Sequence, residues 1–268
     1  MADITFNPNE LILERVFAVE EYNIDTDELY HRYTQPEDSS LKFSADGTDV
    51  VDAVGAPIHT FYNAQSGTFD FSNSLFTLDG AEAQFGSRKV VATADRKITV
   101  PVSQTITIGS DHTAILKYVP VGVKGSEIKY VKVVNANKTF GKTYEISAAP
   151  GDGKFTLNAE TKTITLPEDV TGRVFVNYEK ESAKAVKLTK TADSTPEAVR
   201  LLIHAIFHDP CNPNIVYAGH FVCPRAQVDP SSIEMSLKSD GKHPISYLLR
   251  KPYCDEDGEL CTIIIDGE

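Results

Sequence analysis

The chain has 268 residues, 41% of them hydrophobic, and it carries a net charge of −12 from 26 basic and 38 acidic side chains. This composition is that of a folded globular protein and excludes a disordered chain, while the acidity argues against a surface built to hold phosphates. No apolar run approaches the roughly 20 residues of a membrane span, and the start MADITFNPNE lacks the features of a secretory signal, so we expect a protein that folds in a cytoplasm.

The first elements predicted along the chain are a hairpin and a helix. Residues 16–19 and 29–33 are strand-like runs separated by the polar stretch 23–27, a pattern that predicts two antiparallel strands. Farther on, Ser72 or Asn73 has the side chain of a helix N-cap, and Gly86 is suited to end that helix in the left-handed conformation. Gly80 lies inside this segment and costs up to about 1 kcal/mol relative to alanine.

From residue 97 the sequence changes to short strand-like runs separated by turn residues. Several runs alternate apolar with polar residues, as half-buried antiparallel strands do. The runs are 98–100, 105–108, 114–116, 128–133, 144–146, 155–157, 163–166 and 174–178, and residues 179–187 form a charged link out of this region. So many short strands in about 85 residues are typical of a small sandwich of the immunoglobulin class. The segment has no Trp and no Cys, which excludes an antibody-type domain.

After residue 196 the predicted strands are longer and need partners beyond themselves. They are 201–208, 215–222, 233–238, 245–249 and 260–265. The simplest arrangement pairs them with the strands that precede residue 97. We therefore expect a mainly β protein with a discontinuous core domain, 1–96 with 184–268, built as a β-sandwich or partial barrel with one helix (α+β). An inserted immunoglobulin-like β-sandwich would occupy residues 97–183.

The sequence has no recognisable catalytic or cofactor-binding motif. A serine nucleophile elbow, a phosphate-binding Gly-rich loop and a dinucleotide fingerprint are all absent. His204 and His208 have the spacing of a zinc helix, but their surroundings predict a strand, in which such side chains lie about 13 Å apart. The acidic run 255–259 is better explained by a hairpin turn at Asp257-Gly258 than by a calcium loop. We predict neither an enzyme nor a bound cofactor.

The four cysteines are Cys211, Cys223, Cys254 and Cys261. If Asp257-Gly258 is the centre of a turn, Cys254 faces Cys261 at a separation that permits half of a metal site or a disulfide. Cys211 and Cys223 flank another strand and would supply the other half of a structural zinc site. Because the spacing lacks a Cys-x2-Cys pair, four free thiols in a reducing cytoplasm are the favoured interpretation, and zinc is the alternative.

Two parts of the sequence resemble the tail tube (major tail) proteins of long-tailed bacteriophages. In the first part the resemblance rests on LKFSA (41–45), VDAVGAPI (51–58), GTFDFSNSLF (67–76) and QFG (84–86). In the second part it rests on YAGHFVCPRA (217–226), EMSL (234–237) and DGEL (257–260). The order of these motifs is more informative than any one of them, and together they cover about half of the chain.

The resemblance implies a virion protein that forms hexameric rings, whose sheets join into an inner β-barrel and so remove exposed strand edges. The rings would stack into a tube through which DNA leaves the capsid. Other tail proteins would be partners, DNA would pass without specific binding, and no membrane would be involved. The location would be the phage tail, after synthesis in the host cytoplasm. The 97–183 sandwich is not part of the family pattern and is interpreted as a surface module.

Residues 33–57 are a long polar segment and a candidate for contacts between subunits. Its candidate residues are Gln35, Pro36, Glu37, Asp38, Asp46 and Asp49. We hypothesise that part of this segment reaches a neighbouring subunit or ring and becomes ordered on assembly. An ordinary mobile surface loop is the alternative.

Three other classes of protein remain open from the sequence. The chain fits another virion protein, such as a capsid or decoration protein. It also fits a carbohydrate- or receptor-binding protein whose sandwich offers aromatic residues such as Tyr118 and Tyr130. Finally, an enzyme with a scattered active site is neither shown nor forbidden by the sequence.

Overall fold

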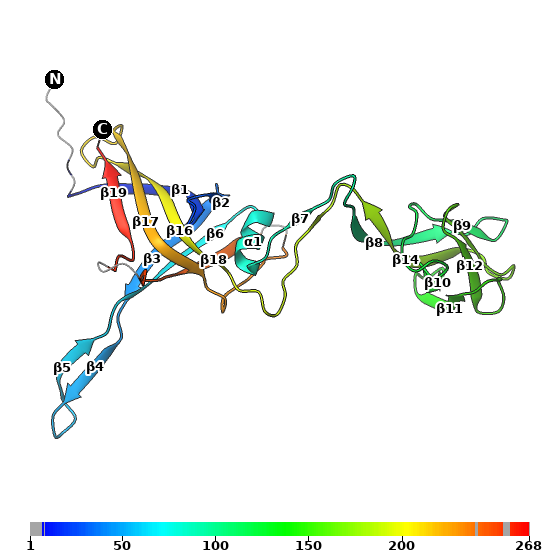
Figure 1. Cartoon of the computed structure of the whole chain (residues 1–268), viewed down its shortest axis with the longest axis horizontal. Helices are drawn as coiled ribbons and strands as arrows, with labels where there is room; N and C mark the ends of the chain where they lie inside the picture. The colour runs from blue at the N-terminus through cyan, green and yellow to red at the C-terminus, as the bar shows by residue number, and fades with distance from the viewer. Residues whose placement is uncertain (1–6, 8, 239–240, 254–257, 268) are drawn as a thin grey trace. The chain divides into compact units, whose positions relative to one another are not determined.

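The computed structural model describes residues 7, 9–238, 241–253 and 258–267, and these are built of strands with one helix among them (Figure 1). Two compact units make up the chain: unit 1 consists of Met1–Lys89 and Leu188–Glu268, and unit 2 of Val90–Lys187. The expected mainly β class with a helix is confirmed.

Unit 1 is built on one antiparallel sheet of eight strands. The strand order is β2 (Leu29–Tyr33), β1 (Ile12–Asn23), β16 (Ala198–His208), β17 (Val216–Val228), β18 (His243–Leu249), β6 (Ser66–Asn73) and β3 (Pro36–Ser44), and β19 (Thr262–Asp266) also pairs with β17. β1 and β2 form the predicted hairpin, with Val19 opposite Tyr33. The predicted pairing of late strands with early ones is confirmed, because β16 pairs with β1 and β18 pairs with β6.

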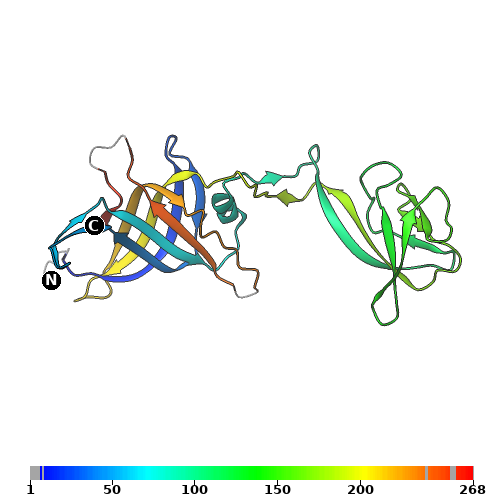
Figure 2. The same ribbon diagram turned by 90° about the horizontal axis from the view of Figure 1, so that it is seen from below.

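The sheet of unit 1 curls into a partial barrel, as expected. Figure 2 shows its strands wrapping around a common interior. Leu13 and Val16 of β1 line the same apolar cavity, of about 190 Å³, as Leu41 of β3, so strands from opposite sides of the sheet approach each other. One face of the curled sheet therefore lines the interior of the partial barrel, and the opposite face forms its outer surface.

Alternation along the strands fills this interior with apolar side chains. In β16 every second residue is buried, namely Val199, Leu201, Ile203, Ala205 and Phe207. Aromatic rings of β6 and β18 complete the core, where the rings of Phe71 and Tyr247 stack with centroids 6.3 Å apart. Burial of such rings contributes most of the hydrophobic stabilisation of a core of this kind.

The helix α1 (Leu78–Phe85) begins later than the sequence predicts. Its N-cap is Thr77, whose hydroxyl accepts a hydrogen bond from the backbone N–H of Gly80 at 3.1 Å. The prediction of Ser72 or Asn73 is wrong, because both residues belong to β6 and pair with β18. The helix ends as predicted at Gly86, which is left-handed (φ 62°) and donates to the carbonyl of Glu82.

Unit 2 is built on one sheet of seven strands with its own core. The order is β8 (Ile98–Thr107), β14 (Arg173–Ser182), β10 (Tyr130–Val134), β11 (Phe140–Ile146), β12 (Lys154–Asn158), β13 (Thr163–Thr165) and β9 (Thr113–Ile115). The first and last segments of unit 2 in the sequence, β7 (Val90–Val91) and β15 (Val186–Lys187), pair with each other as a two-stranded ribbon. Phe155, Ile164 and Val174 are fully buried in this core. The immunoglobulin-like assignment stays a prediction.

Several predicted boundaries differ from the structure. The predicted strands 98–100 and 105–108 are one strand, β8, because its alternation of half-buried and exposed residues is unbroken. The predicted link 179–187 begins inside β14, which pairs with β8 as far as Ser182 opposite Ile98. Residues 233–238 form no strand, although their sequence predicts one. The hairpin turn predicted at 255–259 falls largely outside the described residues.

Candidate assembly surfaces

A hairpin that forms a separate two-stranded sheet projects from unit 1. It is formed by β4 (Gly47–Val51) and β5 (Pro57–Tyr62), which pair only with each other, and we call residues 47–62 the arm (Figure 1). Its tip is a closed turn in which the Asp52 carboxylate accepts hydrogen bonds from the backbone N–H groups of Val54 and Ala56, each at 2.9 Å. The arm is therefore an ordered element and not a random loop.

The surface of the arm is unusually apolar for an exposed element. The side chain of Val54 at the tip is 88% exposed, and that of Tyr62 near the base is 72% exposed. Val50, Val51, Ile58 and Phe61 are also exposed on it. Apolar groups gathered on an element without an intramolecular partner mark a surface that another molecule covers.

The polar segment 33–57, the candidate for contacts between subunits, contains the strand β3 and the first part of the arm. Gln35 directly precedes β3, and Pro36, Glu37 and Asp38 are its first residues. Lys242, beside β18, lies 2.7 Å from the carboxylates of Glu37 and of Asp38. These hydrogen bonds raise the pKa of Lys242 and lower that of Glu37. The segment is thus fixed to its own subunit.

The other two candidates in the segment belong to the arm and its base. Asp46 accepts the backbone N–H of Asn63 through its carbonyl at 2.8 Å and closes the base of the hairpin. Asp49 of β4 accepts the hydroxyl of Thr60 of β5 at 2.5 Å. The sequence reasoning chose the polar residues of this region and missed its apolar ones, such as Val54 and Ile58. Strand-forming residues on either side of the Asp52–Gly55 turn, Val50 and Val51 before it and Ile58 after it, are the signal that identifies a hairpin.

Strand edges are the second kind of surface available for assembly in unit 1. β2 pairs with β1 only from Val19 to Tyr22, and β3 and β19 each have a strand on one side only among the described residues. Ile12 and Leu13 of β1 and Ile263 and Ile264 of β19 are at least half exposed. Unpaired edges with apolar side chains favour the addition of a strand from another chain.

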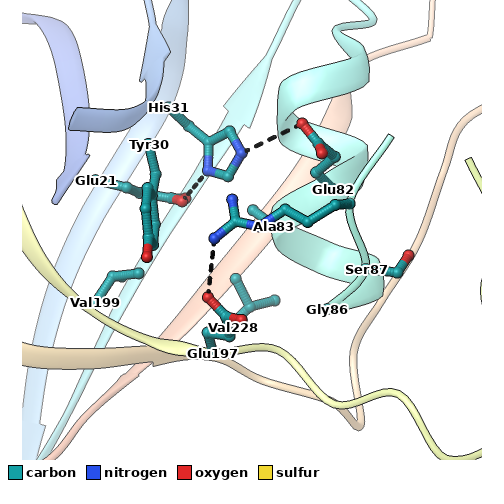
Figure 3. A pocket seen from close by; sticks show the side chains of 11 residues that line it. Glu21, Tyr30, His31, Glu82, Ala83, Gly86, Ser87, Glu197, Val199 and Val228 are labelled. Atoms are coloured by element: carbon teal, nitrogen blue, oxygen red, sulfur yellow. Dashed lines mark hydrogen bonds and ion pairs between the residues drawn. The ribbon is translucent and has the colours of Figure 1, made fainter. Parts of the chain in front are cut away.

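A buried polar cluster fastens α1 to the sheet. Glu21 is 1% exposed, and its carboxylate accepts hydrogen bonds from the phenols of Tyr33 and Tyr247 and lies 2.5 Å from Nδ1 of His31. The other ring nitrogen of His31 is 3.9 Å from the carboxylate of Glu82 in α1 (Figure 3). Burial and the Glu21 charge raise the pKa of both tyrosines well above the usual value.

A cavity of about 120 Å³ lies beside this cluster. Arg88 lies at its rim, with the guanidinium 4.3 Å from the centre of the Tyr30 ring and 3.2 Å from the carboxylate of Glu197. Glu82, which also lines the cavity, is paired with Lys89 at 3.1 Å. Because these charged groups are all engaged with partners, the cluster is explained as a contact between helix and sheet.

The two histidines with zinc-like spacing both lie on β16 and have separate partners on the neighbouring strands β1 and β17. Nδ1 of His204 is 3.1 Å from Nδ1 of His220, and its Nε2 is 3.1 Å from the Glu20 carboxylate. His208 contacts the Glu14 carboxylate at 2.6 Å. Among the residues that the structure describes, no three His, Cys, Asp or Glu side chains are grouped so as to hold a metal ion.

The structure brings together two of the three cysteines that it describes. Cys223 is fully buried in β17 and hydrogen-bonded to the half-buried thiol of Cys261. Cys211 is exposed in the loop between β16 and β17, five residues before the first residue of β17. Cys223 lies seven residues into β17, about 20 Å farther along the chain direction. One ion therefore has no access to both Cys211 and Cys223. Cys254 lies outside the described residues.

The aromatic candidates of unit 2 form no binding site together. Tyr118 lies under the ammonium of Lys180, 3.5 Å from the ring centre, and its backbone N–H donates to Tyr178 at 3.1 Å. Tyr130 is 56% exposed on β10. Nothing in these contacts distinguishes a glycan platform from ordinary surface aromatics.

Comparison with known proteins gives one similarity that spans both units. Residues 11–250 match the model of the YomU/Tube protein family, a range that contains the arm and every strand except β19. No curated protein matches the chain. No described helix is long and apolar enough to cross a membrane.

Proposed function

Because the chain belongs to the YomU/Tube protein family, a family of phage tube proteins, we propose that it forms hexameric rings that stack into the tube of a phage tail. As a family member it is a structural protein of the virion tail. What we propose beyond this family membership is that the chain forms rings and that DNA passes through them. Unit 2 would be an inserted domain on the outside of the tube.

The arm is the observation that carries this proposal. A two-stranded hairpin is at best marginally stable alone in water. This one offers Val54, Ile58 and Phe61 to solvent without covering them against its own subunit. A neighbouring ring that covers the arm would remove this apolar surface from water. The unpaired edges of β1, β3 and β19 supply a second contact, through which the sheets of adjacent subunits would join within one ring.

Removal of the arm tests the proposal. Ser44 and Ser66 are directly opposed across β3 and β6, so residues 45–65 can be replaced by Asn-Gly, a turn that joins opposed strand ends. The armless protein should keep its thermal stability, because the two strands of the arm pair with each other and with no other described strand, and should fail to form long tubes. Scanning calorimetry of the wild-type and armless proteins measures the first outcome, and electron microscopy of the concentrated proteins measures the second.

The matched control is Glu37→Gln with Asp38→Asn, a double variant in which both carboxylates are replaced by uncharged amides. It releases Lys242 but leaves the arm intact, and we expect tubes to form. Tubes of wild-type length without the arm would refute its role. A wild-type protein that stays monomeric and binds glycans would instead favour a receptor-binding protein, and one that binds preformed capsids would favour a decoration protein.

A further inference from the structure

Two thiols face each other across the last strand pair of unit 1. β17 and β19 are antiparallel, with Ala218 opposite Asp266 and Val222 opposite Thr262. One residue farther, this register sets Cys223 opposite Cys261. The two thiols are hydrogen-bonded to each other, and both side chains lie against the core of unit 1.

This arrangement has the geometry of a cross-strand disulfide. Directly opposed residues on antiparallel strands have Cα atoms about 4.5–5.5 Å apart, and a disulfide requires about 4.4–6.8 Å. Directly opposed side chains leave their strands on the same face, as a bond between the two sulfurs requires. The hydrogen bond also lowers the pKa of Cys261 and raises that of Cys223, whose burial acts in the same direction.

The two thiols differ in access to solvent. Cys223 is completely buried. Cys261 lines an open depression of about 490 Å³, together with Phe43, Gln65, Lys251 and Leu260. A small disulfide therefore reaches Cys261 first, and Lys251 in the same depression favours an anionic reagent there.

We propose that Cys223 and Cys261 are a redox-sensitive pair that forms an intramolecular disulfide with a low-molecular-weight disulfide as oxidant. The Cys261 thiolate attacks one sulfur of the oxidant and releases the first small thiol. Cys223 then loses its proton and attacks the Cys261 sulfur of the mixed disulfide, which releases the second small thiol. Two protein thiols are oxidised by two electrons, one small disulfide is reduced, and the two protons leave on the released thiols.

The bond would fasten β19 to β17. β19 pairs only with β17 among the described strands and carries exposed Ile263 and Ile264 on an open edge. The disulfide would close a chain loop from Cys223 to Cys261 and restrict the unfolded chain. The setting rests on the proposed function: a virion leaves a reducing cytoplasm for an oxidising exterior. The bond itself depends only on the two strands.

Two double variants test the proposal in the full chain. Cys211→Ser/Cys254→Ser keeps only the proposed pair, and Cys223→Ser/Cys261→Ser keeps only the other two thiols. Each protein is reduced, treated with oxidised glutathione and denatured, and its free thiols are counted with Ellman's reagent. We expect the first variant to lose both free thiols to a disulfide within one chain, with no glutathione attached and no disulfide between chains. Its melting temperature should rise by about 5–10 °C. The second variant should form no internal disulfide.

Single variants test the order of the steps. Cys223→Ser should retain one glutathione on Cys261, whereas Cys261→Ser should retain none at Cys223, because that thiol is buried. In the wild-type protein, peptide mapping should link residue 223 to residue 261. The proposal is overturned if the first double variant keeps both thiols, forms only dimers, or holds a stable glutathione adduct, or if the wild-type link includes Cys211 or Cys254. None of these outcomes depends on tube formation.

Discussion

Gly86→Ala tests how closely the end of α1 is seated against the segment that leads into β16. Gly86 has φ +62°, and an added Cβ would lie 2.0 Å from the carbonyl oxygen of Thr195 and 2.3 Å from its carbon. Real Cβ atoms essentially never come within 3.0 Å of such an atom. The backbone at Thr195 or the helix end must therefore shift by about 1 Å, and in a packed structure such shifts are strained.

The expected loss of stability has two parts. The left-handed conformation costs alanine about 1–2 kcal/mol relative to glycine, and the forced backbone shift adds about 1–3 kcal/mol. The sum of about 2–5 kcal/mol is a large part of the free energy of unfolding of a typical domain, about 5–15 kcal/mol. The melting temperature of unit 1 should fall by about 5–15 °C.

Scanning calorimetry of the variants separates the two parts. Gly86→Asn carries the same Cβ, but asparagine tolerates the left-handed conformation better than alanine. Gly55→Ala places alanine at φ +87° with nothing within 4 Å. We expect Gly86→Asn to keep the loss that comes from the backbone shift, about 1–3 kcal/mol, and Gly55→Ala to show only the cost of the left-handed conformation, about 1–2 kcal/mol. If asparagine restores most of the loss, or if Gly86→Ala is no worse than Gly55→Ala, the clash with Thr195 is not the cause.

Three further predictions follow from the units, the charge and one histidine. Replacing residues 97–183 by a short Gly/Ser linker should leave unit 1 folded, because Ile98 and Ser182 are paired neighbours; loss of its calorimetric transition would contradict this. Assembled rings should have a net negative lumen, since an acidic wall repels DNA over about 8 Å; a basic lumen, or tight binding of duplex DNA at physiological salt, would count against a conduit. Hydrogen bonds to Glu14 and to the carbonyl of Pro213 raise the pKa of His208 above 6.5. Its contribution to stability is therefore complete below pH 6.5 and lost as the pH rises through the raised value, and an NMR titration should show this pKa falling in Glu14→Gln.

The class of fold could be predicted from the sequence because it depends on alternation, which is local. The runs 105–108 and 163–166 alternate threonine with an aliphatic residue, and all but their last residues lie in β8 and β13, where burial alternates in the same way. The helix cap could not be predicted in the same way. Ser72 and Asn73 have cap side chains, but their pairing with Pro244 and His243 makes them part of β6. That pairing is a contact between residues about 170 positions apart, which no local pattern contains.

The candidate assembly surface is only partly accessible to sequence reasoning. The polarity of the segment around Glu37 and Asp46 is visible in the sequence, whereas the strand β3 and the arm that it forms depend on distant contacts. Lys242, which holds the start of β3, is about 200 residues away along the chain, so its contact leaves no trace near Glu37. The facing of Cys223 and Cys261 was missed for the same reason, since it depends on the register of β17 with β19.

The sheet of unit 1 combines strands from both ends of the chain, and this arrangement sets the order in which the two units fold during synthesis. β1 has to wait for β16, which the ribosome makes about 180 residues later, and at 5–20 residues per second this is a delay of roughly 10–40 s. Unit 2 is continuous in sequence and is complete before β16 emerges. We expect the insert to fold first and to bring the two ends of the interrupted chain together through β8 and β14. The nascent β1 then finds β16 across a connection that is effectively shorter by about 100 residues, which lowers the entropy cost of closing that loop.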